Sequence, residues 1–133
     1  MKKKYVVILA IFVIISTAVI FAIGMFRSAG ANLEQLITMV ITDRDLSCID
    51  DGVYAGSYEV FPVAVEVKVA VEDHMITDVE LVKHQNGQGA DAEILTEQIV
   101  EKQSLQLDAI SGATYSSKVI LKAVENALDS ASN

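Results

Sequence analysis

The stretch VAVEVKVAV, residues 63–71, decides the fold of the middle of this chain. Every second residue is valine, and Glu66 and Lys68 stand between them. Successive side chains of a β-strand point to opposite faces of the sheet, so this alternation predicts a strand with one apolar and one polar face. The apolar face then requires neighbouring strands and a cover.

The flanking segments predict two more strands. VYAGSYEVF (53–61) is rich in β-branched and aromatic residues and ends at Pro62, and MITDVELVKH (75–84) follows a turn at Glu72-Asp73-His74. Three consecutive strands with short links are typical of an antiparallel meander.

The cover is predicted from two helical segments, Asp91–Gln103 and Ser116–Leu128. The second segment carries apolar residues at helical spacing, which predicts a stripe that faces the core: Val119, Ile120, Ala123, Val124, Ala127 and Leu128. Strands followed by helices indicate an α+β fold, an antiparallel sheet covered by two helices, over residues 50–133. Residues 29–49 form a linker before this domain. Within it, the pattern of residues 32–43 predicts a short amphipathic helix with Asn32 as N-cap. The pattern leaves open whether this linker is a stalk or packs on the domain.

An uncharged apolar run of 22 residues extends from Tyr5 to Phe26. As a helix it would be about 33 Å long, enough to cross the hydrocarbon core of a bilayer. Three lysines precede it and only Arg27 follows closely, so the positive-inside rule places the start of the chain in the cytoplasm. A cleavable signal peptide with a site at residues 29–31 is the alternative, but its apolar core is usually shorter. We therefore expect residues 1–28 to be a transmembrane anchor in the cell membrane, with an extracytoplasmic C-terminal domain.

The charge of the chain is concentrated beyond this run. Four of the ten basic residues lie in or beside it, whereas all 18 acidic residues follow it, which leaves six basic and 18 acidic residues and a net charge of −12. Such a balance argues against nucleic acid as a partner. Cys48 is the only cysteine, expected to be a buried or half-buried thiol, and the two histidines lie too far apart in the sequence for a metal site.

The stretch DAISGATYSS, residues 108–117, precedes the last predicted helix. Gly112 permits a positive φ, and Ser116 or Ser117 can cap the helix. The free N–H groups of a first helical turn favour a phosphate, and a phosphate ester on the Thr114 hydroxyl would lie beside them without help from basic residues. The same residues are also those of an ordinary capped turn, and the two interpretations stay open on these grounds.

With its context, this stretch resembles the flavinylation motif of the small FMN-binding domain family, which also occurs in subunits of the sodium-pumping NADH:quinone reductase. DGVYAG (51–56) is similar to the opening strand of that family, and the segments 79–95 and 99–128 are similar to its second half. The resemblance therefore covers the whole predicted domain.

The resemblance implies an FMN cofactor attached through a phosphoester to Thr114. A separate flavin transferase would attach it, using FAD and a divalent metal and releasing AMP. The other positions that match the motif of the family are Asp108, Ser111, Gly112, Ala113, Ser116 and Ser117. His84, Gly87 and Gly89 match a loop near the flavin, although this chain departs from the longer form of that loop. Gly52, Tyr54 and Gly56 match the opening strand, where a packing role is equally compatible with the residue types.

The resemblance therefore implies an electron carrier at the extracytoplasmic face of the cell membrane rather than a self-contained enzyme. A quinone-linked dehydrogenase in the membrane would be its redox partner. Two other functions remain compatible with the sequence: a flavin sensor that binds its ligand without a covalent bond, and a structural module in which SGAT is only a turn.

Overall fold

The computed structural model describes residues 2–85 and 89–132. The chain divides into two units, one up to Asn32 and one from Leu33 onward. In chain order, the elements are α1 (Lys2–Thr38), η1 (Leu46–Cys48), β1 (Gly52–Val60), β2 (Val63–Glu72), β3 (Met75–Gln85), η2 (Ala90–Ile94), α2 (Leu95–Lys102) and α3 (Thr114–Ala131). The folded unit is an α+β domain, as predicted.

The first unit is helical throughout its described part. Residues Lys3–Gly24 of α1 are long and apolar enough to cross a membrane. The same helix continues to Thr38, so Asn32 lies inside α1. The prediction of a separate helix over 32–43 that begins at Asn32 is therefore wrong.

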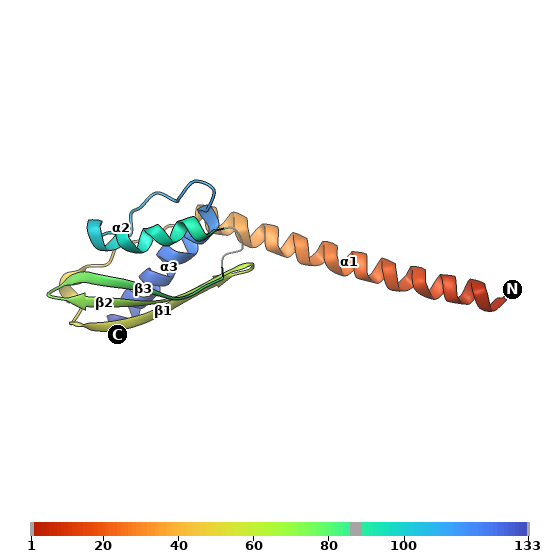
Figure 1. Cartoon of the computed structure of the whole chain (residues 1–133), viewed down its shortest axis with the longest axis horizontal. Coiled ribbons are helices and arrows are strands. Elements are labelled where there is room, and N and C mark those ends of the chain that lie inside the picture. Colours follow the sequence, from red (N-terminus) through yellow and green to blue (C-terminus); the bar gives the residue numbers. More distant parts are fainter. Residues whose placement is uncertain (1, 86–88, 133) are drawn as a thin grey trace. The chain divides into compact units, whose positions relative to one another are not determined.

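The three strands form an antiparallel sheet in the order β1-β2-β3. Val65, Val67, Val69 and Val71 of β2 are at most 1% exposed, whereas Glu66 and Lys68 between them are exposed. The helices α2 and α3 cover this apolar face, with α3 on β1 and β2 and α2 on β3 (Figure 1). The predicted stripe of α3 is buried throughout, which confirms the two-helix cover.

Residues 39–49, here called the strap, pack on the domain. Ile41 and Ile49 belong to the same buried cluster as the sheet and α3, and so does Leu36 just before the strap. Asp43 accepts hydrogen bonds from the backbone N–H of Leu105 and the hydroxyl of Ser104. The strap therefore packs on the domain and contributes to its core. The sequence had left open whether this linker is a stalk or packs on the domain. Cys48 of the strap is exposed, whereas the sequence predicted a thiol at least half buried.

An ion cluster ties the strap to α3. Glu125 is 2% exposed, and its carboxylate pairs with Arg44 at 3.2 Å and with Lys122 at 2.5 Å. Arg44 also donates two hydrogen bonds to Asp129. The hydrogen bond from Arg44 is the main cause that lowers the pKa of the Asp129 carboxyl below its usual value.

Acid is expected to weaken this attachment. Because the folded chain lowers the pKa of Asp129, the pairing stabilises the fold above the unfolded pKa of about 3.9 and is lost as the pH falls through the folded pKa. Asp129→Asn should therefore lower the free energy of unfolding at neutral pH by about 1 kcal/mol or less, since the carboxylate is partly solvated. Urea denaturation should show the gap to the parent narrowing as the pH falls below the unfolded pKa of about 3.9. The exposed variant Glu101→Gln serves as control, and a gap that stays constant with pH would contradict the assignment.

Candidate functional site

The turn before α3 is built from Ile110 to Ala113. The backbone N–H of Ala113 donates to the carbonyl oxygen of Ile110 at 2.9 Å, and Gly112 has a φ of +81°. Residues with a side chain rarely adopt that conformation, so glycine is the residue that this turn requires. No other group lies within 4 Å of the place where a Cβ of Gly112 would project. The outer side of the turn is therefore open.

The helix α3 begins two residues earlier than the sequence predicted. Its first residue is Thr114, its N-cap is Ala113, and no side chain makes a capping hydrogen bond. The two serines predicted as caps do not cap the helix. Ser116 is buried, with 2% of its surface exposed. The hydroxyl of Ser117 accepts a hydrogen bond from the N–H of Ile110 and donates one to the carbonyl of Ala113. Ser117 thus closes the turn from inside the helix.

This arrangement leaves the start of α3 suited to an anion. The first N–H groups of a helix have no intrahelical partner, and here no side chain caps them. They carry the positive end of the helix dipole, which favours a phosphate. Thr114 stands at this end and is half-buried, while Ser111 and Gly112 just before it are exposed.

The link between α2 and this turn is held by the strap. Besides the bonds of Asp43, the side chain of Gln106 donates to the carbonyl of Ile41 at 2.6 Å. Between the strap, the link and α3 lies a hollow of about 340 Å³. Asp108, a predicted site residue, lines it together with residues 39–41, residues 105–107, Lys118 and Leu121.

Lys118 is a residue that the sequence reasoning missed. It follows Thr114 by four positions, the spacing that puts two residues on one face of a helix, and this spacing is readable in the sequence. Its Nζ donates to the carbonyl oxygen of Met39 at 3.4 Å. The sequence reasoning had considered a phosphate at this motif without basic residues, and Lys118 is the basic residue that directly follows the motif.

The loop residues of the predicted site are placed differently. His84, near the end of β3, has a side chain only 4% exposed, and its Nδ1 lies 2.8 Å from the carboxylate of Glu93 in η2. Gly89 is buried and precedes η2, which packs on α3, whereas Gly87 lies outside the described residues. The structure thus brings the motif and Asp108 together around the start of α3, and it places His84 and Gly89 beside an element that contacts this helix.

The opening-strand residues pack rather than line this turn. The hydroxyl of Tyr54 donates to the carbonyl of Asp50, and Gly56 lies against the backbone of α3 at Ala123 and Ala127.

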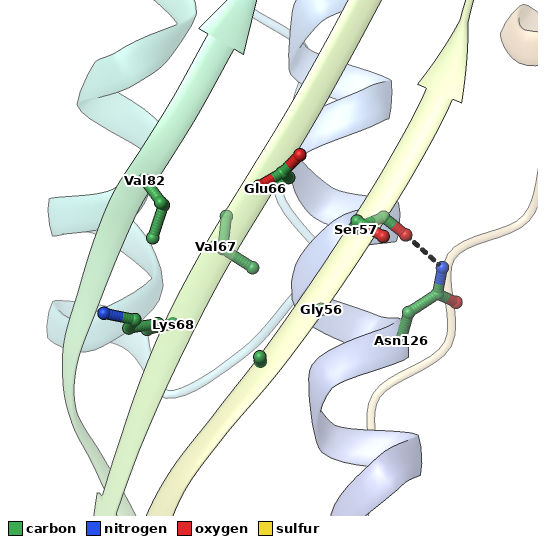
Figure 2. Close-up of a pocket in the computed structure, with 8 residues that line it drawn as sticks. Gly56, Ser57, Glu66, Val67, Lys68, Val82 and Asn126 are labelled. Atoms are coloured by element: carbon green, nitrogen blue, oxygen red, sulfur yellow. Dashed lines mark hydrogen bonds between the residues drawn. The ribbon is translucent and has the colours of Figure 1, made fainter.

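Gly56 also borders a hollow of about 400 Å³ on the outer side of the sheet. Figure 2 shows this hollow between Lys68, Glu66, Val82 and the Asn126–Ser57 hydrogen bond. Lys68 pairs with Glu80 and Glu66 with Lys83, and no predicted site residue of the motif lines it.

A protein-family model matches the part of the chain that contains this turn. The model of one protein family, described as FMN-binding domain, matches residues 62–129, just over half of the chain. The match runs from the start of β2 almost to the end of α3, and it includes Thr114 and the turn before it but not β1 or the strap. No curated protein matches the chain.

Proposed function

Since the chain belongs to the FMN-binding domain family, we propose that it is a membrane-anchored flavoprotein that carries its FMN as a phosphoester on Thr114 and transfers electrons. The observation that carries the covalent part of this proposal is the uncapped start of α3, with a threonine as its first residue. When bound, FMN supplies redox chemistry that takes one or two electrons.

The residues at the turn fit the phosphate group of FMN. Open space faces Gly112, no side chain caps the helix, and the hydroxyl of Thr114 stands at the electropositive end. Neutral peptide N–H groups suit an anion in a domain that is itself acidic. The chain therefore orients the phosphate with its backbone and holds it with a side-chain oxygen.

Attachment at Thr114 needs an enzyme that can reach the motif. Asp108, Ser111 and Gly112 are exposed, which supports recognition by a flavin transferase. In the transfer, the oxygen of Thr114 forms a bond to the phosphorus of the FMN half of FAD while the pyrophosphate P–O bond breaks. AMP leaves, and the hydroxyl proton of Thr114 is released.

The role of electron carrier is supported by the apolar helix that precedes the domain. The segment Lys3–Gly24 tethers the flavin-bearing domain to a bilayer, where a quinone-linked dehydrogenase is the partner that we propose. The distribution of lysines before this segment favours the outer side of the membrane for the domain.

The decisive experiment compares the full chain made with and without a flavin transferase. The protein is purified in detergent, denatured and filtered, and flavin fluorescence and intact mass are measured on the retained chain. We expect one FMN per chain only when the transferase is present. Flavin that passes the filter would identify a non-covalent flavin-binding or sensor protein, and protein without any flavin would contradict the proposal as a whole.

Electron transfer is tested on the loaded protein. Membranes that contain a quinone-linked dehydrogenase and its reduced substrate should bleach the flavin absorbance, and a quinone-site inhibitor should prevent the bleaching. If only a chemical reductant such as dithionite bleaches the flavin, the proposed membrane partner is wrong although the flavin is present.

A further inference from the structure

Lys118 has an unusual position for a cation. It is the fifth residue of α3 and follows Thr114 by four positions, so the two side chains share one face of the helix. The residue is half-buried, and its Nζ is held by one long hydrogen bond, 3.4 Å, to the carbonyl of Met39. It lines the hollow that Asp108 also borders.

The other basic side chains of the domain show how Lys118 differs. Within residues 33–85 and 89–132, four of them pair with carboxylates: Arg44, Lys68, Lys83 and Lys122. Lys102 is exposed at the end of α2, where a cation suits the helix dipole. Lys118 is the half-buried lysine of this part of the chain with no carboxylate within 4.0 Å.

Three physical effects oppose this placement in the flavin-free protein. A partly desolvated ammonium costs free energy unless a counter-charge is near. The positive end of the dipole of α3 disfavours a cation near the start of the helix. A carbonyl at 3.4 Å offers only a weak hydrogen bond in return. An anion at the start of α3 would remove all three disadvantages at once.

We propose that Lys118 is the positioning cation for the phosphate carried by Thr114. Its Nζ leaves the carbonyl of Met39 and pairs with a phosphate oxygen of the flavin, which fixes the orientation of the phosphoester on α3. This inference rests on the proposed attachment at Thr114 and adds a residue outside the DAISGATYSS stretch. In the flavin-free protein, a long hydrogen bond to the carbonyl of Met39 holds the ammonium instead.

The test compares three full-length variants in detergent: Lys118→Met, Lys118→Arg and, as a control with the same loss of charge, Lys102→Met. Purified flavin-free protein is incubated with flavin transferase, FAD and Mg²⁺, and the rate of FMN incorporation is followed by intact mass. We expect Lys118→Met to slow incorporation about tenfold, the scale of one charge-assisted hydrogen bond, whereas Lys118→Arg and Lys102→Met stay near the parent.

Two further readouts separate phosphate contact from a structural role. The ³¹P resonance of fully loaded Lys118→Met should shift relative to the parent, and that of Lys102→Met should not. Thermal unfolding of flavin-free Lys118→Met should match or exceed the parent, because an unfavourable charge has been removed. The inference would be overturned if Lys118→Met acquired FMN at the rate of the parent and, once loaded, had the same ³¹P resonance as the loaded parent. A melting temperature of flavin-free Lys118→Met below that of the flavin-free parent would overturn it as well. A parent that acquires no flavin would instead contradict the attachment at Thr114.

Discussion

Replacing Thr114 by alanine should remove all covalent flavin from protein made with a flavin transferase. The ester requires a side-chain oxygen at the first residue of α3, and alanine has none. The fold should survive, because the Thr114 side chain makes no capping hydrogen bond and alanine is the best helix former. Intact mass of the denatured chain measures the loss of flavin, and thermal unfolding should show a change within about 0.5 kcal/mol.

Two matched variants make this result specific. Thr114→Ser keeps a hydroxyl at the same position and should still acquire flavin. Tyr115→Ala changes the next residue, which is exposed, and should load like the parent. Covalent flavin that persists on Thr114→Ala would show that another side chain carries it, and the exposed hydroxyl of Ser111 would be the first to examine.

Replacing Gly56 by valine should abolish the folded domain. A Cβ at this position would lie 2.2 Å from the carbonyl oxygen of Ala123 and 2.5 Å from the backbone nitrogen of Ala127. Both obstacles belong to the backbone of α3, so no side chain can turn aside to make room. Overpacking in a core costs about 1–3 kcal/mol and more when backbone must move, which is a large part of the roughly 5 kcal/mol available to a small domain.

A graded series tests this prediction by urea denaturation of the full chain in detergent. Gly56→Ala should lower the free energy of unfolding clearly, and Gly56→Val should leave little folded protein. Ala55→Val is the control, since the preceding residue of β1 is exposed on the opposite face of the sheet. Because α3 also carries Thr114, the valine variant should acquire no flavin. A Gly56→Val protein with the unfolding midpoint of the parent would contradict the close packing of α3 on β1.

The central strand was predictable because its pattern has a period of two and only one face is buried, and its neighbours were predictable from residue type and the short links. The predicted ranges 53–61, 63–71 and 75–84 differ from β1, β2 and β3 by one residue at most at each end. A shift by one residue would turn the valines of β2 toward water, so burial leaves little freedom in the register. The apolar stripe of α3 was readable for the same reason, at the helical period.

The family was predictable from a motif, but the geometry of the candidate site was not. The residues from Asp108 to Ser117 resemble a motif of the FMN-binding domain family, and the family match over residues 62–129 confirms that the chain belongs to this family. The start of α3 was placed two residues too late, because serines are common caps and nothing local shows that Ser117 serves the turn from within the helix. His84 ends the predicted strand 75–84 and was matched by resemblance to a loop near the flavin, and only the structure shows that its buried side chain lies beside Glu93.

The amino-acid sequence by itself determined the strands, the helix that faces them, the apolar helix before the domain and the turn with its threonine. Each of these follows from interactions between residues near one another in the chain. Only the tertiary structure decided that the strap packs into the core, that Gly56 lies against the backbone of α3, and that Lys118 reaches the carbonyl of Met39. The contacts behind these features join residues about 60 or more positions apart in the chain, and packing between distant segments leaves no periodic signal in either of them.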